Sequence, residues 1–172
     1  MMKMLTTQVS GLLQRISNLE EESMEETARL LAQAATREGI VFFATFGEMK
    51  SISVNAQFAA ETFPSMQAWT SEIELTSADR VWILTRSCYD EEALSLAKKL
   101  SDQFIPFSAL AAEEISADNM LADLAYTYIS TKLTKGLLPA EDGSRIVLPH
   151  ALAGLFVYEA VKIMVNEMLI GE

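Results

Sequence analysis

The chain contains 172 residues and carries 13 basic and 24 acidic side chains, which leaves a net charge of −11. Non-specific nucleic-acid binding depends on Lys and Arg side chains that displace phosphate counterions, so this charge argues against nucleic acid and, equally, against an anionic membrane surface. Half of the residues are hydrophobic and 22% are charged, which is typical of an ordered domain with a proper core.

Cys88 is the only cysteine, so no intramolecular disulfide can form, and we expect a reducing, cytoplasmic location. Residues 1–22 lack the continuous apolar core of a signal peptide. The most apolar stretch, residues 148–170, contains four charged or amide side chains, which predicts a buried or interfacial helix and no membrane span. One Cys and one His cannot build a Cys/His zinc site of the usual spacing, so we expect no metal and no cofactor.

Apolar residues between Leu5 and Ala35 recur at intervals of three and four, which predicts one or two helices before Gly39. A glycine at this point is typical of a helix C-cap. Two interpretations of the apolar seam remain open. The helices pack on their own domain, or the first helix meets a partner subunit.

After Gly39 the pattern changes to short apolar runs, which are typical of strands buried on both faces. Strands are predicted at residues 40–44, 66–69, 80–85, 105–110 and 125–129, helices at 51–62, 90–103 and 150–169, and a long loop at 134–149. Strands that alternate with helices predict a parallel sheet covered on both faces, a doubly wound three-layer αβα sandwich. We expect one domain over residues 1–172, with N-terminal helices (1–38), an α/β core (39–149) and a C-terminal helix (150–172).

Ligands of open α/β sheets bind beyond the carboxyl ends of the strands, where the strand order reverses. Two loops are predicted at such positions, residues 46–51 and residues 85–90. Both combine hydroxyl groups with backbone N–H groups at the start of a helix, an arrangement that suits a phosphate. Neither loop matches a dinucleotide or Walker fingerprint. The candidate ligand-binding residues are Gly47, Glu48, Met49, Lys50, Ser51, Thr85, Arg86, Ser87, Cys88 and Asp90.

Charge within these loops is mixed. Lys50 and Arg86 are their only cations, and the Arg86 guanidinium suits a bidentate phosphate contact. Glu48 and Asp90 stand beside them and oppose an anionic ligand.

The layout resembles the sugar isomerase (SIS) family over nearly the whole chain, and within that family the phosphoheptose isomerases. Those proteins carry a G-x-G-G-S loop after the first strand and then a helix with a pattern close to D-A-x-H-F-A-x-E. Gly47, Ser51, Phe58, Ala59 and Glu61 match these motifs. The family's second phosphate loop, roughly S-T-S-G-x-S, falls on residues 85–90, where Cys88 replaces the glycine. The resemblance implies a flavodoxin-like SIS fold and a phosphorylated sugar as ligand.

Aldose–ketose isomerisation moves a proton between adjacent carbons, so it needs a base and an acid. The resemblance assigns the base to Glu61 and the acid to the last helix, where His150 matches the first of two family histidines and Leu155 replaces the second. Gln57 replaces a further histidine. We expect a phosphoheptose isomerase-like enzyme with Glu61 and His150 as catalytic residues. The alternative is a phosphosugar sensor or interaction module that kept the fold and lost the catalytic histidine. An unrelated flavodoxin-like protein is a third interpretation.

The assembly expected from the sequence is a homodimer or tetramer. The heptad-like seam near the N-terminus and the apolar last helix both suit a partner subunit. SIS-like proteins are typically dimers or tetramers, so the resemblance implies the same.

Overall fold

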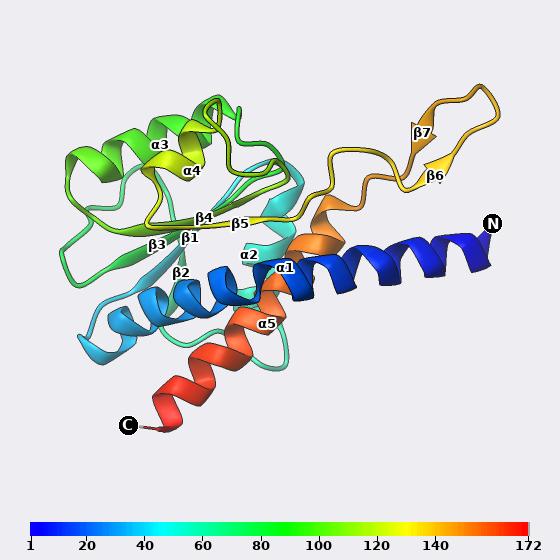
Figure 1. The fold of residues 1–172 in the computed structure, drawn as a ribbon. Coiled ribbons are helices and arrows are strands. Elements are labelled where there is room, and N and C mark those ends of the chain that lie inside the picture. Colours follow the sequence, from blue (N-terminus) through cyan, green and yellow to red (C-terminus); the bar gives the residue numbers. More distant parts are fainter. Residues whose placement is uncertain (172) are drawn as a thin grey trace.

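The computed structural model describes residues 1–171 and contains one five-stranded parallel sheet (Figure 1). Its strands are β1 (Val41–Thr45), β2 (Met66–Ala68), β3 (Arg80–Leu84), β4 (Phe107–Ala111) and β5 (Thr127–Ser130). The helices are α1 (Met2–Thr36), α2 (Lys50–Phe58), α3 (Glu91–Asp102), α4 (Met120–Leu124) and α5 (His150–Ile170), with a short 3₁₀ turn η1 (Gly47–Met49) before α2. The strand order β2-β1-β3-β4-β5 is the flavodoxin-like order, which confirms the predicted doubly wound sheet.

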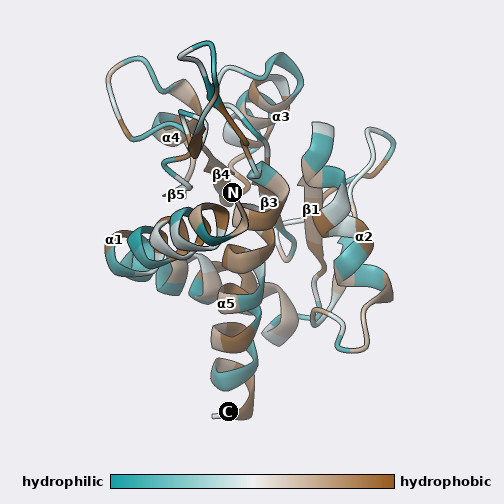
Figure 2. Ribbon diagram, turned by 90° about the vertical axis from the view of Figure 1, so that its right-hand side faces the viewer, coloured by the Kyte–Doolittle hydropathy of each residue, from teal (hydrophilic) through white to brown (hydrophobic). Residues whose placement is uncertain are grey.

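Helices cover both faces of the sheet, and successive residues of each strand alternate between them. Val41 and Phe43 point into the core shared with α1, α2 and α5, whereas Phe42 and Ala44 point into the core shared with α3 and α4. Figure 1 shows α3 and α4 above the sheet and α1 and α5 below it. The strands and much of α5 are coloured hydrophobic in Figure 2. A strand buried on both faces needs a continuous apolar run, and this is the signal that located β1 and β3 in the sequence.

The N-terminal segment, predicted as one or two helices, is one helix of 35 residues. Helix α2 differs from the prediction, because it ends at Phe58, before the predicted Thr62. Helix α4 was missed because five residues are too few to show a helical period, although Asn119 caps it by accepting a hydrogen bond from Ala122 N–H at 2.9 Å.

The prediction of a plain loop at residues 134–149 is wrong, because the segment contains two antiparallel strands, β6 (Leu138–Pro139) and β7 (Arg145–Ile146). The Arg145 guanidinium fastens this hairpin by donating to the carbonyl oxygens of Gly136 and Leu137, each at 2.8 Å. Such contacts between residues nine and eight apart leave no periodic trace in the sequence. In Figure 1 the hairpin and the first turns of α1 project beyond the sheet.

Gly39 does mark the end of α1, but for a different reason from the predicted one. The left-handed residue after the helix is Glu38, with φ 59°, and the Gly39 N–H closes the turn by donating to Ala34 O at 2.8 Å. A Cβ atom at Gly39 would lie 2.0 Å from the carbonyl oxygen of Ala78. The glycine is therefore required for close backbone approach to the segment before β3.

A buried ring of three hydroxyl groups joins α1 to the sheet. Thr27 Oγ1 lies 2.8 Å from Ser108 Oγ and 2.7 Å from Thr127 Oγ1, and Thr127 Oγ1 donates to Ser108 Oγ at 2.7 Å. Each hydroxyl can donate once and accept once within this ring, so all three are paired without water. The ring fixes the position of α1 along β4 and β5.

Across residues 1–171, every helix is too short or too polar to cross a lipid bilayer.

Candidate functional site

The carboxyl edge of the sheet brings the two predicted loops together. Strands β1 and β3 are neighbours, and the chain continues from β1 to one edge of the sheet and from β3 to the other, so the strand order reverses between them. The Phe46 N–H donates to Leu84 O at 3.0 Å and holds the start of the first loop against the end of β3. Residues 46–51 and 85–90 therefore lie side by side, as the sequence predicted.

Two adjoining hollows lie at this edge. The larger one, about 390 Å³, is lined by Glu48, Arg86, Ser87, Ala112, Glu113, Leu133, Thr134, Leu148 and His150. The smaller one, about 260 Å³, is lined by Phe46, Gly47, Glu48, Thr85, Arg86, Ser87, Tyr89 and Asp90. Glu48, Arg86 and Ser87 line both, so the hollows share one wall. We call the two hollows together the edge site.

A hollow of about 580 Å³, larger than either, lies at the opposite edge of the sheet. It is bounded by residues 73–77, which precede β3, and residues 103–105, which precede β4. Ligands of parallel sheets bind at the carboxyl edge, and the chemically distinctive side chains lie there too. The edge site is therefore the candidate functional site, although each of its two hollows alone is smaller than the opposite one.

Two buried polar atoms at the edge site have no hydrogen-bond partner within residues 1–171. They are Thr85 Oγ1, on a residue that is 1% exposed, and His150 Nδ1, on a residue that is 6% exposed. An unpaired buried polar group costs about 1–3 kcal/mol, so folded proteins keep few of them. Each atom belongs to a residue that lines one of the two hollows, which is the arrangement expected where a ligand completes the hydrogen bonding.

His150 is the first residue of α5 and lines the larger hollow. Burial lowers the pKa of its imidazole below the ordinary 6.5, and the Arg86 charge lowers it further, while Glu48 opposes the shift. The imidazole is therefore neutral at pH 7 and offers one nitrogen as a donor and the other as an acceptor. A neutral ring of this kind suits hydrogen bonding to a sugar hydroxyl or carbonyl group.

Arg86 supplies the positive charge of the edge site. Its Nη1 lies 3.4 Å from Glu48 Oε1, and its side chain is 66% exposed. An exposed ion pair of this length is weak, so the guanidinium can turn to an incoming anion at little cost. Gly47 shapes the loop beside it, because its φ of +59° is left-handed and disfavours other residues.

Glu113, which follows β4, fills the loop between β3 and α3. Its Oε1 accepts a hydrogen bond from Ser87 Oγ, and its Oε2 accepts one from the Cys88 N–H, both at 2.7 Å. These hydrogen bonds lower the pKa of the Glu113 carboxyl although burial opposes them, so the group is ionised at neutral pH. Two of the donors that the sequence assigned to a phosphate are therefore occupied by a carboxylate of the chain itself.

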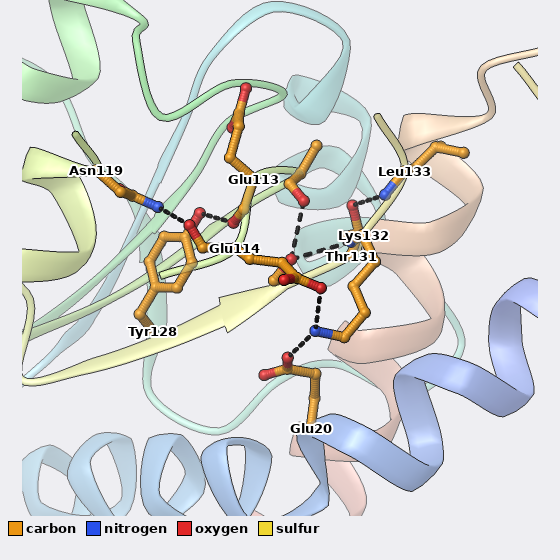
Figure 3. A network of polar contacts seen from close by, with 10 residues as sticks. Glu20, Glu113, Glu114, Asn119, Tyr128, Thr131, Lys132 and Leu133 are labelled. Atoms are coloured by element: carbon orange, nitrogen blue, oxygen red, sulfur yellow. Dashed lines mark hydrogen bonds and ion pairs between the residues drawn. The ribbon is translucent and has the colours of Figure 1, made fainter. Parts of the chain in front are cut away.

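A network of polar contacts holds the segment that carries Glu113 (Figure 3). The Tyr128 hydroxyl donates to Glu113 O at 2.6 Å. Lys132, with a left-handed φ of 60°, reaches Glu20 on α1 at 2.9 Å and Glu114 at 3.3 Å. Burial opposes the charge of Lys132, but these two carboxylates raise its pKa overall. Lys132 thus neutralises its acidic neighbours and fixes the strand end from which Glu113 projects.

Several predicted site residues lie away from the edge site. Met49 is fully buried in the core next to α5, and Lys50 and Ser51 lie on the first turn of α2 outside the lining of the hollows. Cys88 is buried beneath the second loop, where burial first and Glu113 second raise the pKa of its thiol to about 11. Met49 and Cys88 are therefore core residues, and neither lines the edge site.

The structure does not bring Glu61 and His150 together within residues 1–171 of one chain. Glu61 follows α2, has a side chain that is 84% exposed, and lies 3.6 Å from Lys162 Nζ on α5. Lys162 lies about 18 Å further along the helix than His150, at a rise of about 1.5 Å per residue. A shared substrate would have to span this distance or be bound between two chains.

The sequence reasoning missed Glu113, Tyr89, Thr134 and Leu148. Glu113 comes directly after the apolar run of β4, so the rule that searched the carboxyl ends of β1 and β3 would have found it at β4. Leu148 and Thr134 reach the edge site through the hairpin segment, where the Asp142-Gly143 pair is a turn signal that the prediction of a plain loop did not use.

Within residues 1–171, no group of three or more His, Cys, Asp and Glu side chains is arranged to hold a metal ion.

Solved structures with the same architecture define the class of fold. The sugar isomerase domain of the RpiR transcription factor from Sphaerobacter thermophilus matches with a TM-score of 0.60 and 13% identity, over 99% of this chain and 98% of that one. The Vibrio vulnificus NanR protein complexed with ManNAc-6P matches with a TM-score of 0.66 and 14% identity, over 96% of this chain and 61% of that one. The fold is therefore the SIS fold, as the sequence resemblance implied.

The family model described as "Domain of unknown function (DUF2529)" matches residues 1–169, and the chain belongs to that family. It is also 31% identical over 172 residues to the Bacillus subtilis (strain 168) protein YwjG, covering 98% of both chains.

Proposed function

We propose that this protein binds a phosphorylated sugar in the edge site. The observation that carries the proposal is a pair of buried polar atoms, Thr85 Oγ1 and His150 Nδ1, that are unpaired within the described chain and belong to residues lining the two hollows. The Thr85 hydroxyl and the neighbouring Arg86 guanidinium suit phosphate oxygens. The neutral imidazole of His150 suits the sugar.

Relatives of the same fold support this ligand class. NanR is described in complex with ManNAc-6P, and the RpiR domain is described as a sugar isomerase domain. These proteins are only 14% and 13% identical to this chain, so they support the fold and the ligand class but not one particular sugar.

The test of binding is a thermal melt of the full chain with a panel of hexose, heptose and amino-sugar phosphates. A ligand that binds only the folded state increases the free energy of unfolding, by about 2.7 kcal/mol when its concentration is a hundred times Kd. The melting temperature rises as a result. The matching sugars without phosphate are the control, and they should give a smaller shift. A flat response across the panel would refute the proposal.

The finer proposal is aldose–ketose isomerisation of the bound phosphosugar, with phosphoheptoses as the first substrates to test. In this reaction a carboxylate removes a proton from the carbon beside the carbonyl group and returns it to the adjacent carbon. The His150 imidazole can meanwhile pass a proton between the two substrate oxygens.

Two carboxylates compete for the role of base. Glu48 lines the edge site together with His150, whereas Glu61 carries the role that the family resemblance implies but lies beside Lys162. Glu61 would reach a substrate only where a second copy of the chain presents it. The variants Glu48→Gln and Glu61→Gln distinguish them when isomerisation of sedoheptulose 7-phosphate is followed by NMR. Loss of turnover in one variant with retained binding identifies the base.

Ligand binding without turnover in the unmodified protein would instead support a non-catalytic sensor.

A cytoplasmic location and a homodimer or tetramer belong to the same proposal. Leu152 and Ile163 on α5 are large apolar side chains that remain exposed in the single chain, as a subunit interface requires. Sedimentation of the protein at micromolar concentration tests the assembly, and a monomer would contradict it.

A further inference from the structure

The loop that begins helix α3 holds an anion already, and that anion is Glu113. Its two oxygens accept hydrogen bonds from Ser87 Oγ and the Cys88 N–H, both at 2.7 Å. These distances are typical of charge-assisted hydrogen bonds, which are about twice as strong as neutral ones. A carboxylate with two oxygens on two adjacent donors reproduces one edge of a phosphate group.

Two further N–H groups of this loop are also engaged. The Tyr89 N–H donates to Ser87 Oγ at 3.2 Å, and the Asp90 N–H donates to Ser87 O at 3.2 Å. Ser87 can therefore offer its hydroxyl proton to only one acceptor at a time. A phosphate oxygen obtains that proton only after Glu113 has released it.

An unpaired polar atom in the same loop, two residues before Ser87, is a second feature that suits a ligand. Thr85 Oγ1 is buried in the loop, has no hydrogen-bond partner within residues 1–171, and belongs to a residue that lines the smaller hollow. Ser87 lines both hollows, so it connects the position of Glu113 with the unpaired hydroxyl. A tetrahedral anion that displaced Glu113 could use the donors of Thr85 and Ser87 together, which the carboxylate does not.

The backbone of Glu113 is fixed, so its release is a movement of the side chain alone. The Tyr128 hydroxyl holds the Glu113 carbonyl oxygen, and the Ser130 hydroxyl and the Lys132 N–H hold the preceding Ala112 carbonyl at 2.8 and 3.0 Å. These contacts connect the segment to β5 (Figure 3). Rotation about the side-chain bonds of Glu113 is therefore enough to open the loop without unfolding it.

We propose that Glu113 is a built-in competitor that occupies the anion position of residues 85–90 and that the phosphate of the ligand binds by displacing it. The inference rests on the proposed binding of a phosphorylated sugar and adds a rule of selectivity. A phosphate dianion, with three oxygens, can replace the two carboxylate contacts and gain the Thr85 hydroxyl. The carboxylate of a sugar acid can make only the two contacts that Glu113 already makes, so a sugar acid is not expected to displace Glu113.

The test is a calorimetric titration of the full chain and three variants with inorganic phosphate and with sedoheptulose 7-phosphate. Glu113→Gln keeps the shape of the side chain and removes its charge, and Glu113→Ala removes the group. Glu114→Gln is the matched control, because it is the adjacent residue, changes the net charge equally, and has a side chain that is 70% exposed and directed to Lys132. Thermal melts establish that each variant is folded. If Glu113→Gln does not fold, the titration is carried out with Glu113→Ala.

Loss of the Glu113 charge should tighten phosphate binding by at least about tenfold, since one charged hydrogen bond is worth about that factor. The phosphate affinity of the Glu114→Gln variant should stay within about twofold of that of the unmodified chain. Equal or weaker binding by both Glu113 variants would overturn the inference, while binding of the sugar phosphate to the unmodified chain would leave the proposed function standing. Absence of binding in all four proteins would overturn both.

Discussion

Two buried threonines in this protein have opposite hydrogen-bonding states. Thr27 on α1 is fully buried, and its hydroxyl is paired with both Ser108 and Thr127. Thr85 at the end of β3 is buried to almost the same degree, yet its hydroxyl has no hydrogen-bond partner in the described chain. The residue type and the burial are the same, so the difference lies in what surrounds each hydroxyl.

The comparison separates structural polar groups from groups that a ligand can use. The ring around Thr27 is closed and complete, so it can contribute to stability and has no donor left for anything else. Thr85 lines one hollow and His150 the adjoining one, and a buried polar atom of each is unpaired within residues 1–171, so both keep unused hydrogen-bonding capacity next to the edge site. Trp82 Nε1 and the Tyr158 hydroxyl are also unpaired within residues 1–171, but they belong to the core beneath α5.

The largest expected effect on stability comes from Thr27→Val. The substitution keeps the shape and leaves Ser108 and Thr127 each short of one hydrogen bond in a buried place, so the free energy of unfolding should fall by about 1–3 kcal/mol. The melting temperature should fall by about 2–4 °C for each kcal/mol in a chain of this size. Urea denaturation measures the change. Binding of a sugar phosphate should be unaffected, and an unchanged stability would mean that the ring contributes nothing.

Thr85→Val should give the reverse pattern. The change removes a hydroxyl that has no partner in the described chain, so the free energy of unfolding should stay within about 0.5 kcal/mol or rise. Affinity for a sugar phosphate should fall by about tenfold, which corresponds to one lost hydrogen bond to a charged group. Calorimetry on the same preparation measures both. A variant that is strongly destabilised and binds normally would show that the two threonines do not differ in the proposed way.

The titration of His150 sharpens the comparison through pH. Burial lowers the pKa of the folded imidazole below its unfolded value, so the unfolded chain binds the proton more tightly. The contribution of His150 to stability is therefore present above pH 6.5 and is lost as the pH falls from 6.5 to the lower folded-state pKa. Unfolding should become easier across that interval, and His150→Gln should flatten that part of the profile. A variant with the same pH dependence as the parent would contradict the assignment.

The smallest expected effect concerns Cys88, in the same loop as Thr85. Burial and the nearby Glu113 carboxylate raise the pKa of its thiol to about 11, so at pH 8 the group is almost wholly protonated. A colorimetric disulfide reagent should leave the folded chain unmodified and react at once with the chain unfolded in guanidinium chloride. Fast modification of the folded protein would show that the loop opens far more readily than its hydrogen bonds imply.

The sheet could be predicted because its signals are local. The apolar runs of β1 and β3 each lie between polar segments, and a helical period appears on either side of them. The alternation of these strands with helices predicted a parallel, doubly wound sheet, and the strand order itself comes from the structure. The β6–β7 hairpin and α4 could not be predicted in this way, because a two-residue strand and a five-residue helix have no measurable period.

The edge site was predicted in position but not in detail. Thr85, Arg86 and His150 lie at the edge site because the carboxyl ends of parallel strands meet at one edge. Met49 and Cys88 were assigned to the ligand because they lie in the loops, but the direction of a side chain depends on tertiary packing. The contact between Glu113 and Ser87 joins residues 26 apart, and no pattern within either segment indicates it.

The most direct test of the proposed function uses the imidazole of His150, which is the only histidine in the chain and so gives a single set of ring signals in an NMR spectrum. The spectrum is recorded while a sugar phosphate that shifts the melting temperature is added. The account predicts that the ring signals move with the same saturation curve as the binding heat, because Nδ1 gains its missing partner. Saturable binding that leaves the imidazole signals in place would contradict the assignment of the edge site.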